Sequence, residues 1–244
     1  MAYRDLILPT LIAFYAFLLI GGMGAYLLFG GPPPHVAWTA PVFMLVAGIL
    51  AFWLTAPGYR WGTLVAGIVG FAAEVIGVHT GFPFGGYEYT DAFAPHLFEV
   101  PVVLCCAWMV LIAYVREMLR PFYLARLAEA LFVGLWMTAI DLLLDPVAAG
   151  PLGLWRWEAP GAYFGIPAVN FAGWFLVSAF ICLIVSGPKA PSPGCRWLGV
   201  SIVVFFLFHA LTQGLLVPGL VGIAVLGVHP LVNQLARKQE PVYA

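Results

Sequence analysis

Apolar residues run along this chain in long blocks, separated by short polar connections that contain proline or glycine. The blocks lie at about 6–29, 37–56, 61–80, 100–119, 123–145, 165–187, 198–215 and 217–235. Because a helix needs about 20 apolar residues to cross a bilayer, each block predicts a transmembrane helix. The pattern therefore predicts an all-α, polytopic integral membrane helical bundle in one domain, residues 1–244.

The number of spans depends on the last apolar stretch. Residues 198–229 are too long for one helix with ordinary tilt, and the segment "QGLLVPG" (213–219) supplies the Gly and Pro of a break. We therefore expect eight transmembrane helices, with seven as the alternative.

Composition supports a membrane protein and narrows its partners. Hydrophobic residues make up 63% of the chain and charged residues 9%, whereas soluble domains carry about 25% charged residues. The net charge of −1, without a run of Lys or Arg, argues against nucleic acid as a partner. The four cysteines form no CxxC pair, which favours buried thiols over a disulfide or a metal site.

The basic residues predict the orientation in the membrane. If eight spans alternate, one side receives Arg60, Arg116, Arg120, Arg126, Lys189, Arg196, Arg237 and Lys238, and the other receives Arg156. By the positive-inside rule the first side is cytoplasmic. We therefore expect a protein of the cytoplasmic membrane, with its two long loops, 81–99 and 146–164, on the outer face.

Two helix–loop–helix units, about 61–119 and 123–187, resemble each other in sequence. Each unit has a carboxylate near the end of a span, a pair of alternating aromatic residues, and a proline followed seven residues later by tryptophan. Glu74 precedes Pro101 by 27 positions, and Asp141 precedes Pro167 by 26. This spacing indicates a duplicated unit, in which each proline begins a span and the two carboxylate-bearing faces meet.

Three acidic residues fall inside predicted spans: Glu74, Asp141 and Asp145. A charge at mid-membrane costs about 2.5–3.5 kcal/mol, and no Lys or Arg lies three or four positions away in the same helices. Asp141 and Asp145 share a helix face, so each disfavours ionisation of the other. We expect at least one carboxyl to be neutral and able to donate a proton; carboxyls hydrogen-bonded within the bundle are the alternative.

The other acidic residues are expected to do less. Glu117 lies at a span end, where solvation is expected, and Glu129, near the start of its helix, is expected to extend toward water.

Aromatic and polar residues gather around the three carboxylates in the sequence. The candidate substrate-binding residues are Tyr87, Tyr89, Trp108, Trp155, Trp157, Tyr163, Asn170, Trp174 and His79. Aromatic faces stabilise cations, so a proton donor beside them suits chemistry through a carbocation. An interfacial aromatic belt is the competing interpretation of the Tyr and Trp residues. We expect no metal site, because the five histidines are scattered.

The stretches 74–108 and 141–174 resemble a known family, the membrane carotenoid-biosynthesis proteins of bacteria and archaea that act as carotenoid 1,2-hydratases. The resemblance implies addition of water to the terminal 1,2 double bond of a linear or monocyclic carotenoid, such as lycopene or γ-carotene, without a cofactor. It also implies a lipophilic carotenoid substrate within the lipid bilayer and leaves room for contact with other enzymes of the pathway.

The residues suggest roles and leave alternatives open. Asp141 or Asp145 would be the general acid, Glu74 would hold or activate water, and Asn170 or His79 would complete the hydrogen-bond network. A carotenoid end-group cyclase shares the protonation step. An intramembrane prenyltransferase would use the Asp141–Asp145 pair to hold Mg²⁺, although a second aspartate-rich motif is missing. A proton-coupled transporter would also keep carboxylates in its spans.

Overall fold

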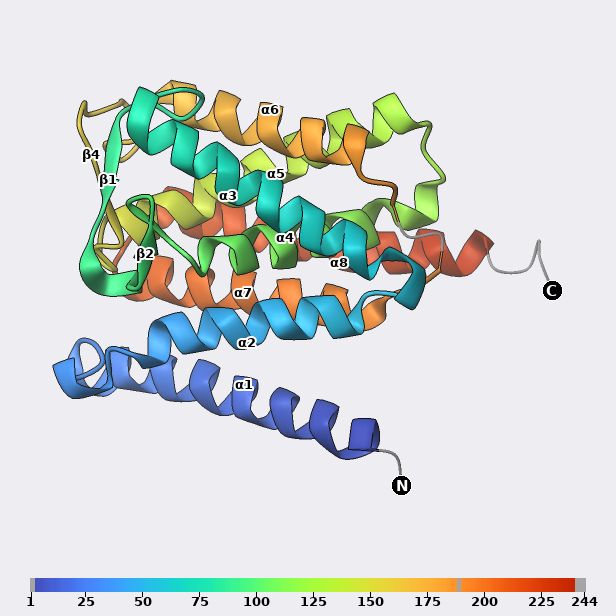
Figure 1. Cartoon of the computed structure of the whole chain (residues 1–244), viewed down its shortest axis with the longest axis horizontal. Helices are drawn as coiled ribbons and strands as arrows, with labels where there is room; N and C mark the ends of the chain where they lie inside the picture. Colours follow the sequence, from blue (N-terminus) through green and yellow to red (C-terminus); the bar gives the residue numbers. More distant parts are fainter. Residues whose placement is uncertain (1–2, 188–189, 240–244) are drawn as a thin grey trace.

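The computed structural model describes residues 3–187 and 190–239. Eight α-helices cross this part of the chain (Figure 1): α1 (Tyr3–Phe29), α2 (Thr39–Leu54), α3 (Arg60–Thr80), α4 (Leu104–Leu119), α5 (Arg126–Ala149), α6 (Ala168–Ile184), α7 (Pro193–Thr212) and α8 (Leu216–Gln239). Four short strands lie in the loops: β1 (Tyr87–Tyr89), β2 (His96–Leu97), β3 (Val100–Pro101) and β4 (Trp155–Trp157).

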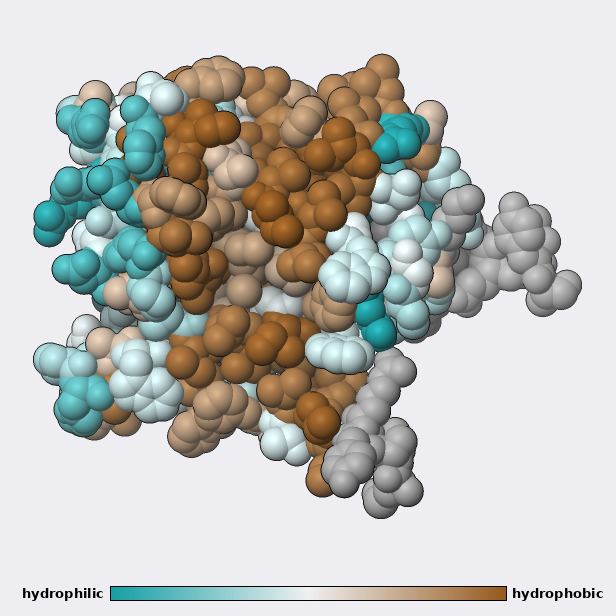
Figure 2. All heavy atoms as spheres, in the orientation of Figure 1, coloured by the Kyte–Doolittle hydropathy of each residue, from teal (hydrophilic) through white to brown (hydrophobic). Residues whose placement is uncertain are grey.

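The helices form a membrane bundle, as the hydrophobic pattern predicts. Among the described residues, six helical segments are long and apolar enough to cross a bilayer: Leu6–Phe29, Pro34–Leu54, Pro57–Thr80, Arg126–Ala149, Pro193–Thr212 and Leu216–Leu235. The span that contains α2 includes the 3-10 turn before it, and α6 is a shorter apolar helix of 17 residues. Figure 2 shows a broad apolar band across the middle of the molecule, with hydrophilic residues gathered at its ends. The predicted break is confirmed, because α7 ends at Thr212, Gly214 has a φ of +71°, and α8 begins at Leu216.

Helix α4 lies at the centre of the bundle and packs against α2, α3, α5 and α7. Every residue from Trp108 to Met118 except Ala113 is buried. The buried stretch includes Arg116 and Glu117, and charged side chains avoid lipid, which favours a position inside the bundle. Helix α1 lies at the edge of the bundle (Figure 1), against α2 and α7, with most of its large side chains exposed to the surroundings.

The two long loops join at one end of the bundle through an antiparallel ribbon of β1 and β4 (Figure 1). Tyr87 pairs with Trp157, Glu88 with Arg156, and Tyr89 with Trp155. Side chains alternate along a strand, so the four aromatic rings share one face of the ribbon. Glu88 and Arg156 occupy the other face, exposed, with 3.9 Å between their charged atoms. The ribbon thus connects the two units that resemble each other; the duplication itself stays a prediction.

The two prolines that were expected to begin spans behave differently. Pro167 directly precedes α6. Pro101 instead lies in β3, paired with His96, and α4 begins three residues later at Leu104. The prediction for Pro101 is therefore wrong, because the 81–99 loop ends in a small hairpin that uses this proline before the chain re-enters the bundle.

Candidate functional site

Glu74 lies in the last third of α3 and is held by three neutral donors. Tyr87 and Tyr89 donate hydroxyl hydrogen bonds to Oε2, at 2.5 and 2.9 Å. The Trp108 indole donates to Oε1, at 3.0 Å. Glu74 is buried, so these bonds compensate for the water that its carboxyl group loses. Strand β1 and helix α4 thereby position a carboxyl group that α3 carries.

Two glycines of α3 make this arrangement sterically feasible. A Cβ at Gly70 would lie 2.1 Å from Cγ of Trp108, and a Cβ at Gly77 would lie 2.9 Å from the Tyr87 hydroxyl. Both distances are well inside van der Waals contact. Glycine at these positions therefore lets Trp108 and Tyr87 approach the helix closely enough to reach Glu74.

Asn170 of α6 joins the two aspartates of α5. Its side-chain Nδ2 donates to Oδ2 of Asp141 at 2.8 Å and to Oδ2 of Asp145 at 2.6 Å. Trp155 and Trp157 donate to the other oxygen of Asp145, at 2.8 and 3.3 Å. Both oxygens of Asp145 are thus engaged as acceptors.

Asp141 differs from the other two carboxyls in one respect. Its Oδ1 atom is buried and makes no hydrogen bond with any described residue. A carboxyl oxygen in that position is available to carry a hydrogen. Asp141 is therefore the member of the group with an uncommitted oxygen.

The electrostatics of the group come from carboxyls and neutral donors. Glu74 lies close enough to both aspartates for their negative charges to repel. The bonds and ion pairs observed among the described residues bring no Arg or Lys to any of the three. The described part of the chain likewise holds no cluster of three His, Cys, Asp or Glu side chains arranged for a metal ion.

The tyrosines of β1 act as donors in this group. Burial and, next, the negative charge of Glu74 raise the pKa of Tyr89 well above its usual value. The pKa of Tyr87 is raised by the same two causes. Both hydroxyls therefore keep their protons and are too weakly acidic to protonate an alkene.

Aromatic contacts join the two halves of the site. The rings of Trp108 and Trp174 stack with centroids 4.8 Å apart and planes at 21°. Tyr87 packs on Trp157 at 5.1 Å, across the ribbon. The carboxyl groups of the two units are thus brought together behind one continuous set of rings.

An apolar cavity lies against these rings. Tyr89, Trp155 and Trp174 form the wall toward the carboxyl groups. The exposed surface of the cavity is entirely apolar, and the rest of its wall comes from Met44, Phe93, Leu104, Ala107, Val110, Leu111, Leu144, Leu154, Ile202 and Phe206. Sequence reasoning missed this second set, because these residues are ordinary core residues in separate helices and no local motif marks them.

Two of the predicted site residues lie apart from the hydrogen-bond network. His79 is half-exposed; its Nδ1 is 2.9 Å from the Val75 carbonyl oxygen, and its Nε2 is 3.8 Å from Glu99. Asn170, and not His79, therefore completes the network. Tyr163 donates to the carbonyl oxygen of Leu142 at 2.8 Å and lies beside the group rather than in it.

The structure also changes the expected correspondence between the two units. The spacing in the sequence matches Glu74 with Asp141. In the structure Asp145 is the counterpart of Glu74, because Asp145 accepts hydrogen bonds from the two tryptophans of β4, as Glu74 accepts them from the two tyrosines of β1. Asp145 lies one turn after Asp141 and four residues before the end of α5, so it is the aspartate nearer to the loop that carries β4.

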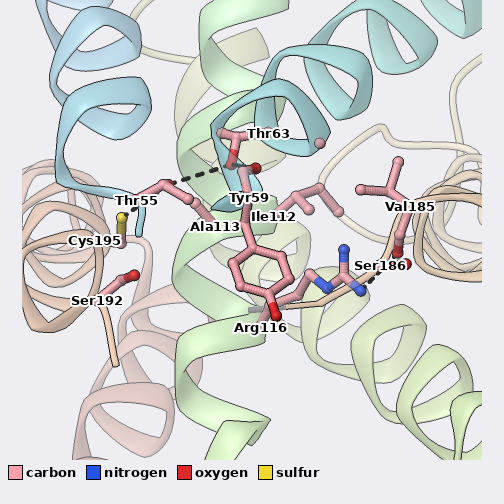
Figure 3. A pocket seen from close by; sticks show the side chains of 11 residues that line it. Thr55, Tyr59, Thr63, Ile112, Ala113, Arg116, Val185, Ser186, Ser192 and Cys195 are labelled. Atoms are coloured by element: carbon pink, nitrogen blue, oxygen red, sulfur yellow. Dashed lines mark hydrogen bonds between the residues drawn. The ribbon is translucent and has the colours of Figure 1, made fainter. Parts of the chain in front are cut away.

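A separate and more polar pocket lies at the other end of the bundle, away from this site (Figure 3). Thr55, Thr63, Ser192 and Arg116 contribute to its wall. Arg116 points its guanidinium group toward Val185, whose carbonyl oxygen accepts a 2.7 Å hydrogen bond. None of the three carboxyl groups lines this pocket.

The sequence of this chain matches that of known proteins. The sequence model of a family described as "Carotenoid biosynthesis protein" matches residues 37–230. A bisanhydrobacterioruberin hydratase of Haloarcula japonica is 30% identical over 192 residues, which is 75% of this chain and 58% of that protein. The chain thus spans less than two thirds of this relative's length. No solved structure matches the chain.

Proposed function

Because this chain belongs to the carotenoid biosynthesis protein family, we propose that it is a carotenoid hydratase. The reaction is addition of water across the terminal 1,2 double bond of a linear or monocyclic carotenoid of the lycopene or γ-carotene type. The name of the Haloarcula japonica relative supports hydration. A membrane bundle with an apolar cavity suits a substrate that is dissolved in lipid.

The single observation that carries the mechanism is the buried, unbonded Oδ1 atom of Asp141. We assign this oxygen the proton that is transferred to C2 of the substrate. The transfer leaves a tertiary cation at C1 and a carboxylate on Asp141. Water then forms the C–O bond at C1 and gives up a proton, which restores the Asp141 carboxyl group. The net change is the addition of one water molecule.

We assign Glu74 the role of holding that water molecule. Its Oε1 accepts one hydrogen bond, from Trp108, whereas Oε2 accepts two. A carboxylate oxygen can accept a further bond, so Oε1 can orient a water molecule near the cation. Trp174 and Trp155, which line the cavity, present aromatic rings that stabilise a cation by about 0.5–2 kcal/mol each.

The aromatic wall also has to admit the substrate. Tyr89, Trp155 and Trp174 line the cavity, and the carboxyl groups lie behind them. Contact between a substrate end and Asp141 therefore requires one of these rings to rotate. Such a movement would let the reacting end in while the rest of the wall excludes bulk water.

The proposal extends to placement in the cell membrane. Arg60, Arg116, Arg120, Arg126 and Arg196 lie at helix ends opposite the β1–β4 ribbon, whereas Arg156 lies in the ribbon; Lys189 lies outside the described residues. The positive-inside rule then puts the ribbon and both long loops on the outer face of the cytoplasmic membrane of a bacterium or archaeon.

The test is hydration by the purified protein in isotopically labelled water. Conversion of lycopene to a product that is heavier by one labelled water supports a hydratase. A product of unchanged mass would indicate a cyclase, which uses the same protonation but excludes water. No conversion of any acyclic carotenoid would contradict both.

A further inference from the structure

A second apolar cavity lies directly beside the first one. It lies between α1, α2 and α7. The two cavities share four wall residues: Met44, Phe93, Leu154 and Phe206. Because these side chains face both spaces, the cavities adjoin, and a ligand that extends from the aromatic wall to the inner face of α1 displaces the side chains between them.

Helix α1 forms the far side of this second cavity. Leu18, Leu19, Gly22 and Tyr26 of α1 are part of its wall. The family match begins at residue 37, so α1 lies outside the region that the family shares. The far end of the combined space is thus built by a part of this chain that is not accounted for by the family match.

The two cavities differ in what they offer a ligand. The first adjoins the rings that hold Glu74 and Asp145. The second is lined mainly by apolar side chains, with Tyr26 and Thr39 as its hydroxyl-bearing residues, and the Thr39 hydroxyl is already bonded to the Val36 carbonyl. A ligand that fits both spaces would be a long apolar chain with its reactive end in the first cavity.

We propose that the second cavity binds the polyene portion of the substrate, and that α1, through Gly22 and Tyr26, determines how long a substrate the protein accepts. This inference rests on the proposed hydratase function and specifies where the unreactive part of the molecule lies. It assigns α1 a role in substrate selection in addition to membrane anchoring.

Gly22 is the most informative residue in this wall. A Cβ built there meets no heavy atom within 4 Å, so a side chain at this position begins in open space and extends into the cavity. Gly21 and Gly24 have equally open surroundings. What distinguishes Gly22 from them is that it lines the cavity.

The neighbouring Gly21 provides a matched control. A Cβ at Gly21 also meets nothing within 4 Å, but Gly21 is exposed on the outer side of α1 and does not line the cavity. Gly21→Leu and Gly22→Leu make the same change in composition, one residue apart in the same helix. Only the second change fills the cavity.

The experiment compares two substrates in purified full-length protein. One is a full-length acyclic carotenoid, and the other is a short acyclic isoprenoid hydrocarbon with the same terminal double bond. We expect Gly22→Leu to lower kcat/KM for the carotenoid on the order of tenfold, since the leucine side chain occupies space that the substrate would fill and its burial beside the substrate forces both to shift. The short substrate, which needs only the first cavity, should react at an unchanged rate, and Gly21→Leu should match the wild type with both.

Binding is measured separately from turnover. In an Asp141→Asn background, the absorption shift of a bound carotenoid reports affinity, and Gly22→Leu should weaken it by a similar factor. Gly22→Ala should have a smaller effect than Gly22→Leu, because it fills less space.

The possible failures are distinguishable. If wild-type protein hydrates the carotenoid but Gly22→Leu has equal kcat/KM, or loses activity equally with both substrates, the role of α1 is refuted while the hydratase proposal stands. If wild-type protein hydrates neither substrate, the hydratase proposal itself fails. Equal losses in Gly21→Leu and Gly22→Leu would also refute the inference, because they would indicate a general effect on α1.

Discussion

Two groups of carboxyls that are buried or partly buried lie toward opposite ends of this bundle, and their partners differ. Glu74, Asp141 and Asp145 accept hydrogen bonds from Tyr, Trp and Asn side chains. At the other end, Glu117 pairs with Arg120 at 3.2 Å, and Glu129 pairs with Arg116 at 3.3 Å. Burial alone therefore does not distinguish a chemical group from a structural one.

The partners decide what each group can do. A guanidinium fixes the charge of its carboxylate and removes it from proton transfer. Neutral donors satisfy a carboxyl without fixing its charge, so a proton can still move. Glu117 makes the contrast clear: it is buried, accepts from the Ser192 backbone N–H at 3.0 Å, and is not the solvated residue that its place at a helix end suggested.

Asp141→Asn is expected to have the largest effect on hydration, and it tests the difference between the two groups of carboxyls. The amide keeps the shape and the hydrogen bond to Asn170 but has no acidic proton. We expect hydration to fall by about 10²- to 10⁴-fold, the usual contribution of a general acid, with the fold unchanged. Pigment analysis in a lycopene-accumulating host measures the product. Glu129→Gln, in the other group, is the control; loss of product there, or retention in Asp141→Asn, would contradict the assignment.

Arg116→Met tests the opposite group. It leaves Glu129 partly buried without its cation, and the Val185 carbonyl without its donor. We expect the free energy of unfolding to drop by about 3 kcal/mol, as for other broken buried pairs. The hydration rate per folded molecule should not change. Denaturation of the purified protein in detergent measures the first quantity.

The exposed pair of Arg156 and Glu88 is the control for that experiment. Its charged atoms are 3.9 Å apart in water-accessible positions, where ion pairs stabilise little. Arg156→Met should therefore leave the unfolding midpoint close to that of the wild type. A large shift of the unfolding midpoint in Arg156→Met, or a loss of specific activity in Arg116→Met, would contradict the assignment of a structural role to the Arg116–Glu129 pair and a chemical role to the other group.

Trp108→Phe is expected to have an intermediate effect. It keeps a stacking ring beside Trp174 and removes the hydrogen bond to Glu74. We expect the hydration rate to fall about tenfold, since a hydrogen bond to a charged group contributes about 1.5 kcal/mol or more. Trp61 lies at the exposed start of the helix that carries Glu74, and Trp61→Phe should leave the hydration rate unchanged. Equal rates in both variants would remove Trp108 from the site.

The smallest effect separates two tryptophans of one strand. Trp155 donates to Asp145 at 2.8 Å, and Trp157 donates at 3.3 Å. Hydrogen bonds within membrane proteins average about 0.6 kcal/mol, so Trp157→Phe should reduce activity only two- to threefold, and Trp155→Phe should reduce it more. The ratio of the two initial rates is the measurement, and a reversed order would show that hydrogen-bond length does not rank these residues.

Much of the fold was readable in the sequence because hydrophobic blocks set the helices. The eight-helix count followed from the Gly and Pro in residues 213–219; Gly214 does lie in the connection between α7 and α8, whereas Pro218 lies in the first turn of α8. The start of α4 was missed, because a proline inside a loop hairpin carries the same sequence signal as one at a helix start.

The candidate site was predictable in part. The carboxylates, the paired aromatics and Asn170 stood out because polar residues are expensive in a span. The cavity wall did not, since residues such as Met44 and Phe206 are typical of any core and meet only through tertiary packing. Likewise, the ion pair of Arg116 with Glu129 joins residues 13 positions apart on two helices, so periodicity within one helix could not reveal it.

The pairing of Tyr87 with Trp157 and of Tyr89 with Trp155 makes the loop lengths unusually consequential. A single residue inserted or deleted between either strand and its helix would turn the ribbon over. Glu88 and Arg156 would then face the carboxyl groups of the site, and the four rings would lie on the exposed face. The helices would survive such an indel, whereas the donors to Glu74 and Asp145 would be lost together, so loop length is as much a determinant of this site as any side chain in it.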